Sequence, residues 1–373
     1  MPALFFAFFV SAVLTGWVVH AGARGGLLVM DHDVTGPQKF HSRPVPRIGG
    51  VGILMGLVAA MALLAFLSPS AAGVGAKLLL CASPAFVAGF AEDVTKRVSP
   101  SKRLLATAIS AGLAFAYLGA QITRSDIPGI DFIVSYTAGA ALVTVIAVAG
   151  IANSVNIIDG FNGLASMCVV IMLAALAYVG FQVNDLVVGT LALAGIGAIL
   201  GFFVWNFPAG LIFLGDGGAY FLGFLVAELS ILLLVRNPGT VSPLFPLLVC
   251  VYPVFETLFS IYRRRFLKAV PPSMPDGIHL HSLIYRRVMR WAVGNRGAQA
   301  LTRRNSMTSP FLWLLCMFSV VPAVIFWSQT AVLAGFLLLF AFSYVLLYWR
   351  IVRFKSPRWM RMLTSRPVPL GKR

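Results

Sequence analysis

The stretch LVTVIAVAGIANSVNIIDGFNGLASMCVVIMLAALAYVGF, residues 142–181, consists of two apolar runs separated by a short polar segment. The first run begins before this stretch, at Phe132, and the second is Leu164–Phe181, so each approaches the length of about 20 residues that a helix needs to cross the hydrocarbon core of a bilayer. The polar segment repeats every three positions, so consecutive members share one helical face. Its members are Asn153, Asn156, Asp159 and Asn162. The pattern predicts two membrane-spanning helices joined by a polar turn.

The composition of the whole chain agrees with this stretch. Of 373 residues, 59% are hydrophobic and 11% charged, whereas soluble domains are about half apolar and about a quarter charged. This excludes an ordinary soluble protein. The 29 Lys and Arg against 12 Asp and Glu give a net charge of +17, which we attribute to a membrane surface, with no nucleic acid as partner. The four cysteines lie in apolar runs without paired spacing, so neither a disulfide framework nor a zinc site is expected.

Eleven apolar stretches along the chain are candidates for membrane spans. They are Leu4–Val19, Ile48–Leu67, Ala76–Ala91, Leu104–Gln121, Phe132–Ala152, Leu164–Phe181, Leu186–Trp205, Ala219–Val235, Val241–Ile261, Pro310–Trp327 and Ala331–Trp349. The third is short and the sixth to eighth are crowded, so ten is the alternative count. Glycines four residues apart, Gly52 with Gly56 and Gly197 with Gly201, are typical of close helix packing. We expect an all-α polytopic bundle forming a single membrane domain over residues 1–373.

Basic residues are distributed unevenly between the two sets of loops. Nearly all lie in one set, which includes a loop at 262–309 and a tail at 350–373; Arg124, Arg236 and the helix-edge Lys77 are the exceptions. Because cytoplasmic loops carry the excess of Lys and Arg, we expect an external N-terminus and a cytoplasmic C-terminus.

Carboxylates gather in the loops of the predicted cytoplasmic side. Glu92 and Asp93 precede Lys96, and Asp216 lies in a Gly-Asp-Gly-Gly turn before the next span. Adjacent carboxylates repel each other unless one is protonated or a cation lies between them, and oxygen ligands without thiols suit Mg²⁺. The alternatives are an interfacial charge pair of the two acids with Lys96 and Arg97, and a helix-capping role for Asp216.

Two further segments point to a polar site. The row at 153–162 is suited to line a water-filled cleft, with helix capping as the alternative. The loop at 262–309 contains His279 and His281, which predict binding of phosphate oxygens or, more weakly, of a metal; an ordinary solvated loop is the alternative. Arg265 belongs to an arginine triplet at the exit of the preceding helix, which we interpret as a positive-inside anchor; binding of anionic lipid headgroups is the alternative.

No phosphate-binding glycine loop, zinc-protease helix or nucleophile elbow occurs in the sequence. The inventory of carboxylates, bases and amides therefore indicates Mg²⁺-assisted phosphoryl chemistry on a membrane-delivered substrate. In order and wording, these segments resemble the polyprenyl-phosphate N-acetylhexosamine-1-phosphate transferases, the superfamily of bacterial translocase I and of the enzymes that initiate O-antigen and enterobacterial common antigen.

Five ordered motifs between Asp33 and about Arg287 carry the resemblance. They match Asp33, Lys39, His41, Pro46 and Gly49-Gly50; then Glu92, Asp93, Lys96 and Lys102; then Asn153, Asn156, Asp159, Gly160, Asn162, Gly163 and Leu164; then Asn206, Phe213, Gly215 and Asp216; and finally His279 and His281. The separated histidines are more similar to the O-antigen-initiating branch than to translocase I, whose histidines are consecutive.

The resemblance implies a reaction and a set of residue roles. A UDP-N-acetylhexosamine would donate its sugar phosphate to undecaprenyl phosphate, releasing UMP, with Mg²⁺ or alternatively Mn²⁺ as cofactor. The catalytic residues would be Asp93, Glu92, Asp159, His279 and His281. The substrate-binding residues would be Lys39, His41, Lys96, Asn153, Asn156, Asn162, Asn206, Phe213 and Arg265. The metal ligands would be Asp216 and Asp93.

The resemblance also implies a place in the cell. The site would lie on the cytoplasmic face of a bacterial cytoplasmic membrane and would initiate cell-surface polysaccharide, such as lipopolysaccharide O-antigen. Whether Asp93 deprotonates or orients the acceptor phosphate, or an Asp acts as covalent nucleophile, stays open. The identity of the sugar and a homodimeric assembly stay open as well.

Two acidic positions depart from the family pattern. Glu92 replaces an Asp, and Asn162 replaces an acid that would face the uracil, although an amide still offers a donor and an acceptor. A catalytically impaired family member is therefore one alternative. A secondary transporter or channel is another, supported by Glu228 and Glu256 within spans. A CDP-alcohol phosphotransferase is not supported, because its Asp spacing is missing.

Overall fold

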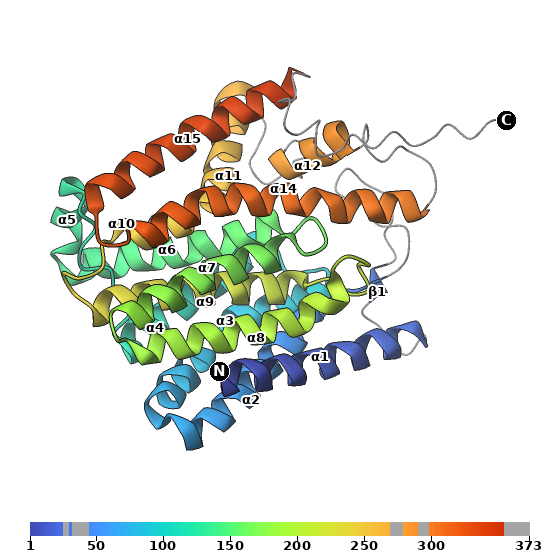
Figure 1. Ribbon diagram of the computed structural model, residues 1–373, viewed down its shortest axis with the longest axis horizontal. Coiled ribbons are helices and arrows are strands. Elements are labelled where there is room, and N and C mark those ends of the chain that lie inside the picture. The colour runs from blue at the N-terminus through green and yellow to red at the C-terminus, as the bar shows by residue number, and fades with distance from the viewer. Residues whose placement is uncertain (25–29, 32–44, 269–278, 290–297, 354–373) are drawn as a thin grey trace.

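The computed structural model describes residues 1–24, 30–31, 45–268, 279–289 and 298–353. In these ranges the chain forms a bundle of long helices that lie side by side (Figure 1). The α-helices are α1 (Pro2–Ala23), α2 (Gly49–Leu67), α3 (Pro69–Thr95), α4 (Pro100–Leu118), α5 (Pro128–Val134), α6 (Thr137–Ile158), α7 (Leu164–Gln182), α8 (Leu186–Asn206), α9 (Gly215–Arg236), α10 (Leu244–Val249), α11 (Val251–Tyr262), α12 (Leu280–Leu283), α14 (Ala298–Ile325) and α15 (Thr330–Val352). π-Helical segments at Arg263–Lys268 and Ile284–Met289 follow α11 and α12. Strands β1 (Met30–Asp31) and β2 (Val45–Pro46) pair antiparallel.

The predicted all-α membrane bundle is confirmed. Among the described residues, 9 helices are long and apolar enough to cross a membrane. They are α1, α2, α3, α6, α7, α8, α9, α14 and α15, and each overlaps one of the predicted spans. The chain is therefore a multi-pass membrane protein.

The two remaining predicted spans differ from the expectation. The fourth predicted span is α4, which is not among the nine helices. Its first turn carries Lys102 and Arg103, which lower the hydrophobicity of the helix. The ninth is broken at Cys250 into α10 and α11. Pro253 has no N–H for the carbonyl of Val249, and its ring clashes with that carbonyl, so a continuous helix is not favoured there.

Helix boundaries differ from the predicted ones at two other places. The third span, predicted as short, is the 27-residue α3, which begins at Pro69. Helix α14 begins at Ala298, well before the predicted Pro310, so the last part of the expected loop 262–309 is helical. This part was missed because residues 302–309 are largely polar.

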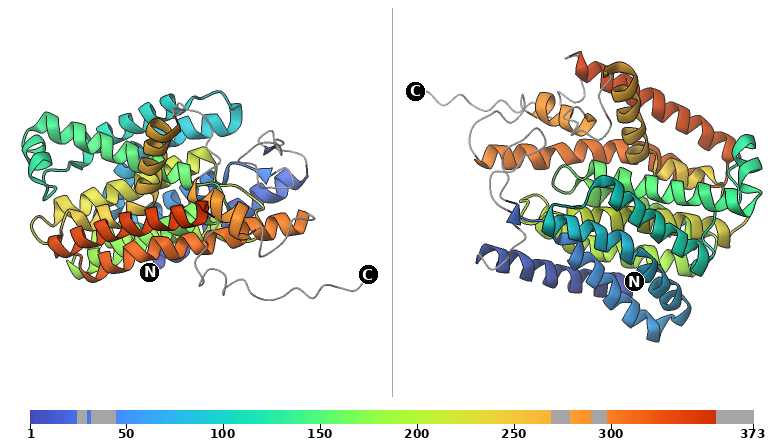
Figure 2. Two further views of the ribbon diagram at one scale, coloured as in Figure 1. Left: turned by 90° about the horizontal axis from the view of Figure 1, so that it is seen from above. Right: turned by 180° about the vertical axis from the view of Figure 1, so that it is seen from behind.

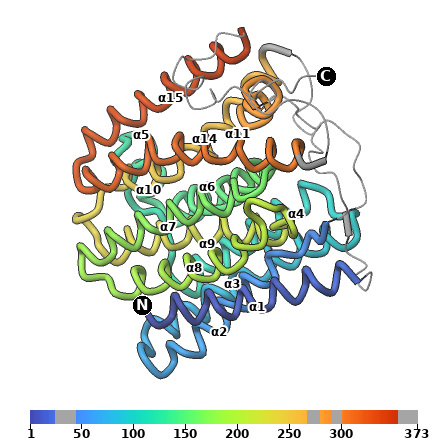
Figure 3. The backbone as a smooth tube through the Cα atoms, turned by 45° about the vertical axis from the view of Figure 1, so that its right-hand side comes forward, coloured from blue at the N-terminus to red at the C-terminus, as the bar shows by residue number. Residues whose placement is uncertain are grey.

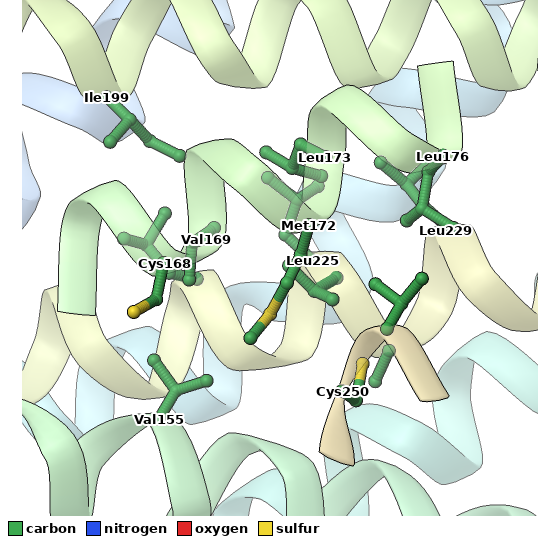
Figure 4. Packing of buried hydrophobic residues seen from close by; sticks show 14 of the residues in the cluster. Val155, Cys168, Val169, Met172, Leu173, Leu176, Ile199, Leu225, Leu229 and Cys250 are labelled. Carbon is green, nitrogen blue, oxygen red and sulfur yellow. The ribbon is translucent and has the colours of Figure 1, made fainter. Parts of the chain in front are cut away.

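Helix α9 occupies the centre of the bundle. It packs against α3, α6 and α7, and nearly all of its residues are buried. Figures 1 and 3 show α1 and α15 on opposite sides of the molecule, with α7, α8 and α9 between them. A helix that is apolar on all sides is expected to be enclosed by others. Figure 4 shows Leu225 and Leu229 of α9 beside Met172 and Leu176 of α7.

Small residues bring several helices into close contact. A Cβ on Gly197 of α8 would lie 2.0 Å from the backbone oxygen of Leu4 in α1, and one on Gly201 would lie 2.4 Å from that of Phe8. Gly52 and Gly56 of α2 also face α1. The prediction that these glycine pairs line helix interfaces is confirmed.

The long helices place several polar segments at one end of the bundle. Strand β1 (blue) and helix α12 (orange) lie at the same end in both views of Figure 2. The C-terminus of α3 and the N-terminus of α9 meet there, because their backbone and side-chain groups are hydrogen-bonded. That meeting point is the candidate site.

Candidate active site

The carboxylate of Asp93, in the last turn of α3, caps the N-terminus of α9. Its Oδ1 accepts the backbone N–H of Asp216 at 2.8 Å and its Oδ2 accepts that of Gly217 at 2.9 Å. Asp93 is 3% exposed, and Nη2 of Arg47 lies 3.8 Å from its Oδ1. Free N–H groups at a helix N-terminus attract anions, so Asp93 is held by the end of α9.

The carboxylate of Asp216 points to side chains of two other helices. Asn156, in the last turn of α6, donates from Nδ2 to Oδ1 of Asp216 at 2.7 Å. Nη1 of Arg103, in the first turn of α4, donates to Oδ2. The side chain of Asp216 is 17% exposed and that of Arg103 is 11% exposed. Asp216 thus joins α4, α6 and α9 at one partly buried point.

Tyr220 extends this cluster by one turn along α9. It lies four residues after Asp216 and so shares its helical face. Its ring lies under the guanidinium of Arg103, with the Cζ 5.6 Å from the ring centre, and its hydroxyl donates to Oδ1 of Asn153 at 3.1 Å. The predicted residues Asn153, Asn156 and Asp216 are therefore brought together, on one face of α6 and one of α9.

Glycines allow the backbone to approach this cluster closely. A Cβ on Gly50 would lie 2.4 Å from the Cα of Gly218, and one on Gly89 would lie 2.6 Å from the Cα of Gly217. Gly215 has φ +78°, a conformation that favours glycine. The resemblance had matched glycines at 49–50 and 215 to family motifs, and the structure shows that two of these segments are adjacent.

Backbone hydrogen bonds join the same two segments. The N–H of Phe213 donates to the oxygen of Pro46 at 2.8 Å, and the N–H of Gly49 donates to the oxygen of Phe213 at 3.0 Å. The N–H of Gly50 donates to Leu214 at 2.9 Å. Phe213 is half-buried at this junction.

Asp159 lies directly after α6, in the turn that the polar row predicted. Burial raises the pKa of its carboxyl to about 8, and the nearby charges of Asp216 and Asp93 act in the same direction. Three carboxylates therefore interact electrostatically at this end of the bundle. A cation among them would relieve that repulsion.

The turn after α6 is tied to the start of α14. The backbone N–H of Asn162 donates to Oδ1 of Asn305 at 2.9 Å, and Ser309 donates to the backbone oxygen of Asn162 at 2.6 Å. The Asn162 side chain donates to the oxygen of Pro208 at 3.3 Å. Asn206 accepts from the N–H of Gly163 at 2.6 Å. Asn162 and Asn206 are each 5% exposed, so in this structure both hold loops together.

The histidines lie against the same turn. The rings of His279 and His281 stack with centres 5.1 Å apart, and the ring of His281 lies 5.5 Å from that of Phe161. A Cβ on Gly160 would lie 3.4 Å from Nε2 of His281. The histidine motif and the motif of Asp159, which are far apart in sequence, are thus neighbours.

Other predicted residues lie differently. Glu92 accepts the N–H of Val98 at 2.6 Å and so faces the turn between α3 and α4. Lys96 ends α3 with φ +54° and is exposed. Arg265 is exposed after α11. Lys39 and His41 lie outside the described residues.

Arg103 and Tyr220 belong to the site but lie outside the motifs that carry the family resemblance. The neighbouring Lys102 matches the family motif, but its side chain is exposed. Arg103 shares a face of α4 with the buried Thr107, Ser110 and Ala111. The face of Lys102 carries the more apolar Ala106, Ile109 and Leu113, so hydrophobicity along the helix gives no signal that Arg103 points inward.

Comparison with known proteins agrees with the motifs. Residues 76–234 match the model of glycosyl transferase family 4. A probable undecaprenyl-phosphate N-acetylglucosaminyl 1-phosphate transferase of Bacillus subtilis is 29% identical over 81% of this chain and 78% of that protein. A phospho-N-acetylmuramoyl-pentapeptide-transferase of Clostridium botulinum is 31% identical over 61% of this chain and 69% of that protein. A decaprenyl-phosphate N-acetylglucosaminephosphotransferase of Mycolicibacterium smegmatis is 27% identical over 86% of this chain and 81% of that protein.

A membrane helix bundle with a carboxylate, amide and guanidinium site at one end fits this class of transferase. The chain belongs to glycosyl transferase family 4, in the superfamily of polyprenyl-phosphate N-acetylhexosamine-1-phosphate transferases.

Proposed function

We propose that the chain transfers an N-acetylhexosamine-1-phosphate from a UDP-sugar to undecaprenyl phosphate, with UMP and a lipid-linked sugar diphosphate as products. The relatives named for this reaction and the family support it. The observation that carries the site assignment is the cluster of Asp216, Asn156 and Arg103 at the N-terminus of α9, beside Asp93. The transporter alternative is not favoured.

The donor atoms of this cluster fit Mg²⁺. No three or more of the described His, Cys, Asp and Glu side chains converge into a complete metal-binding group. Mg²⁺ takes one or two protein carboxylates and completes its shell with waters and substrate phosphates. Asp216 would be the principal ligand, with Asp93 beside it. The ion would supply charge neutralisation on the diphosphate of the donor.

Arg103 is suited to hold a phosphate oxygen. Its Nη1 is bonded to Asp216, while its buried Nε has no hydrogen-bond partner among the described residues. A buried unpaired donor carries a desolvation cost that a charged acceptor removes. We propose that the diphosphate of the UDP-sugar accepts this hydrogen bond.

Asp159 is the candidate for proton exchange with the acceptor. A carboxyl with a pKa of about 8 holds and releases a proton near neutral pH, as a general acid or base must. Asp93 would orient the reacting groups, because each of its oxygens accepts a backbone N–H at the end of α9. His281 would bind a phosphate oxygen beside the turn that carries Asp159.

The distribution of basic residues supports a location of this site on one particular side of the membrane. The carboxylate end of the bundle carries Arg47, Lys96 and Arg103, and Lys and Arg concentrate on the cytoplasmic side of membrane proteins. We propose that the active site lies on the cytoplasmic face of a bacterial inner membrane, where UDP-sugars are made.

Purified protein in detergent, incubated with undecaprenyl phosphate, Mg²⁺ and a panel of UDP-N-acetylhexosamines, tests this function. We expect UMP release and a labelled lipid-linked sugar diphosphate with at least one donor, and loss of both with EDTA. Asp216→Asn should lower UMP release by about 100-fold or more. Asp131→Asn is the matched control and should retain activity. Asp131 lies in α5 and accepts hydrogen bonds from Ser125. Failure of every donor with the wild-type protein would instead favour a transporter or an inactive scaffold.

A further inference from the structure

Glu256 is a buried carboxylate that the proposed chemistry does not use. It lies in α11, is 1% exposed, and accepts three hydrogen bonds. Nδ1 of His279 lies 3.0 Å from its Oε1, the N–H of Leu280 donates to the same oxygen at 3.0 Å, and the hydroxyl of Tyr344 in α15 donates to Oε2 at 2.5 Å. Both carboxylate oxygens are therefore engaged, one by the histidine motif and one by α15.

These contacts define the state of the His279 ring. A carboxylate only accepts hydrogen bonds, so Nδ1 of His279 carries a hydrogen. The hydrogen bond also restrains the orientation of the ring, because the N–H of Leu280 holds the accepting oxygen of Glu256 in place. A carboxylate on one imidazole nitrogen is the usual device for orienting the other nitrogen toward a site.

The fixed ring passes its orientation to the turn at Asp159. His279 stacks on His281 with an interplanar angle of 13°. His281 in turn lies against Phe161 and directs Nε2 toward Gly160. A change in the plane of His279 would therefore displace His281 beside the turn that follows Asp159.

We propose that Glu256 is a positioning residue for the transfer reaction: it holds His279 in the Nδ1–H tautomer and thereby sets the stacked position of His281 at the active site. The inference rests on the proposed function of this end of the bundle. It also assigns α15 a role, since Tyr344 fixes the second oxygen of Glu256. Glu256, one of the two acids that supported a transporter in the sequence analysis, thus contacts the histidine motif.

Kinetics of Glu256→Gln and Glu256→Asp test the proposal. His279 and Leu280 share Oε1, so a glutamine would offer both of them one neutral amide oxygen in place of the negatively charged one. Its N–H group would face the hydroxyl of Tyr344, which now donates to Oε2. We expect kcat of Glu256→Gln to fall about 10-fold or more while the KM for the UDP-sugar changes less than about twofold. Glu256→Asp should recover part of kcat, because it restores the negative acceptor. An unchanged kcat in Glu256→Gln would overturn the proposal.

Glu228→Gln is the matched control. Glu228 is also fully buried, in α9, but neither of its carboxyl oxygens has a hydrogen-bond partner in the described part of the chain. Neutralising it removes a buried acid without touching the histidines, so kcat should stay at the wild-type level. An equal loss of kcat in both variants would show a general effect on the bundle and would also overturn the proposal.

A double-mutant cycle separates positioning from an independent effect. If Glu256 acts through His279, then Glu256→Gln should have little additional effect on kcat in a His279→Gln background. Additive losses in the double variant would contradict this.

A measurement on the wild-type protein reads the tautomer of His279 directly. With ¹⁵N-labelled histidine, nitrogen chemical shifts distinguish the two tautomers, and the signals of His279 are assigned by their loss in His279→Gln. We expect the Nδ1–H form for His279; the Nε2–H form would overturn the proposal. Because this readout needs no turnover, it stays informative if the wild-type protein transfers no sugar phosphate, the result that would count against the proposed function itself.

Discussion

The carboxylate of Asp93 spans the backbone N–H groups of Asp216 and Gly217, at 2.8 Å and 2.9 Å. The end of α3 and the beginning of α9 are therefore one unit, although more than a hundred residues separate them in sequence. A change at Asp93 reaches Asp216 directly through the hydrogen-bonded backbone.

Replacing Asp93 by Asn should weaken this unit and the activity together. One amide oxygen can accept only one of the two N–H groups well, so we expect the free energy of unfolding to fall by ~1–2 kcal/mol. UMP release should fall about 10-fold or more, because Asp216 loses its fixed position. In Glu92→Gln, the side chain that faces Val98 changes instead, and UMP release should stay within about threefold of wild type. The reverse order of effects would contradict the assignment of roles to these adjacent acids.

Replacing Arg103 by Lys should reduce phosphate binding. A lysine keeps the charge but lacks the planar fork that contacts Asp216 and lies over Tyr220. We expect kcat/KM for the UDP-sugar to fall about 10- to 100-fold, equivalent to ~1.4–2.8 kcal/mol. Arg97→Lys, in the exposed turn before α4, is the control and should leave kcat/KM unchanged. An equal kcat/KM in the two variants would contradict a role of Arg103 in phosphate binding.

The glycine contacts predict a large difference between two Gly→Ala changes in the same helix. A Cβ on Gly89 would meet the Cα of Gly217 at 2.6 Å, whereas one on Gly73 would meet nothing within 4 Å. We expect Gly89→Ala to destabilise the protein by ~1–3 kcal/mol through overpacking. Gly73→Ala should be neutral or stabilise α3 by up to ~1 kcal/mol. Thermal unfolding in detergent measures both, and a wild-type Tm for Gly89→Ala would show that α3 and α9 are not in backbone contact.

The raised pKa of Asp159 predicts a pH dependence of stability. The pKa is about 8 in the folded protein and ~3.9 in an unfolded chain. Between these values the folded state holds a proton that the unfolded state has released, so the free energy of unfolding decreases as pH rises from about 4 to about 8 and then levels off. Thermal unfolding of Mg²⁺-free protein from pH 5 to pH 9 should show this slope, and Asp159→Asn should reduce it. An identical slope in the two proteins would exclude Asp159 as its source.

The membrane spans could be predicted from the sequence because twenty apolar residues have few other uses. The polar row was equally clear, since Asn153 and Asn156 recur at helical spacing and both lie on the last turns of α6. The break at Cys250 was not predicted, because apolar composition continues across it and only Pro253 marks the change.

The site residues that could not be predicted from the sequence share one property. Their role depends on which way a side chain faces across the bundle. Lys102 and Arg103 are adjacent, and tertiary packing places only Arg103 beside Asp216. Asn305 and Ser309 support the turn at Asn162 from α14, which the polar composition of that segment had hidden in a predicted loop. Their contacts join residues more than 140 positions apart, beyond the reach of any local pattern.

The close approach of α2, α3 and α9 through Gly50, Gly89, Gly217 and Gly218 limits which parts of the protein can change. Main chain lies against main chain there, so almost no side-chain volume is available for selection to change. Variation in donor sugar must therefore come from segments that surround this junction, whereas the junction itself would be inherited as a fixed part. Engineering of a new sugar preference should leave these four glycines untouched and randomise the side chains of the surrounding turns.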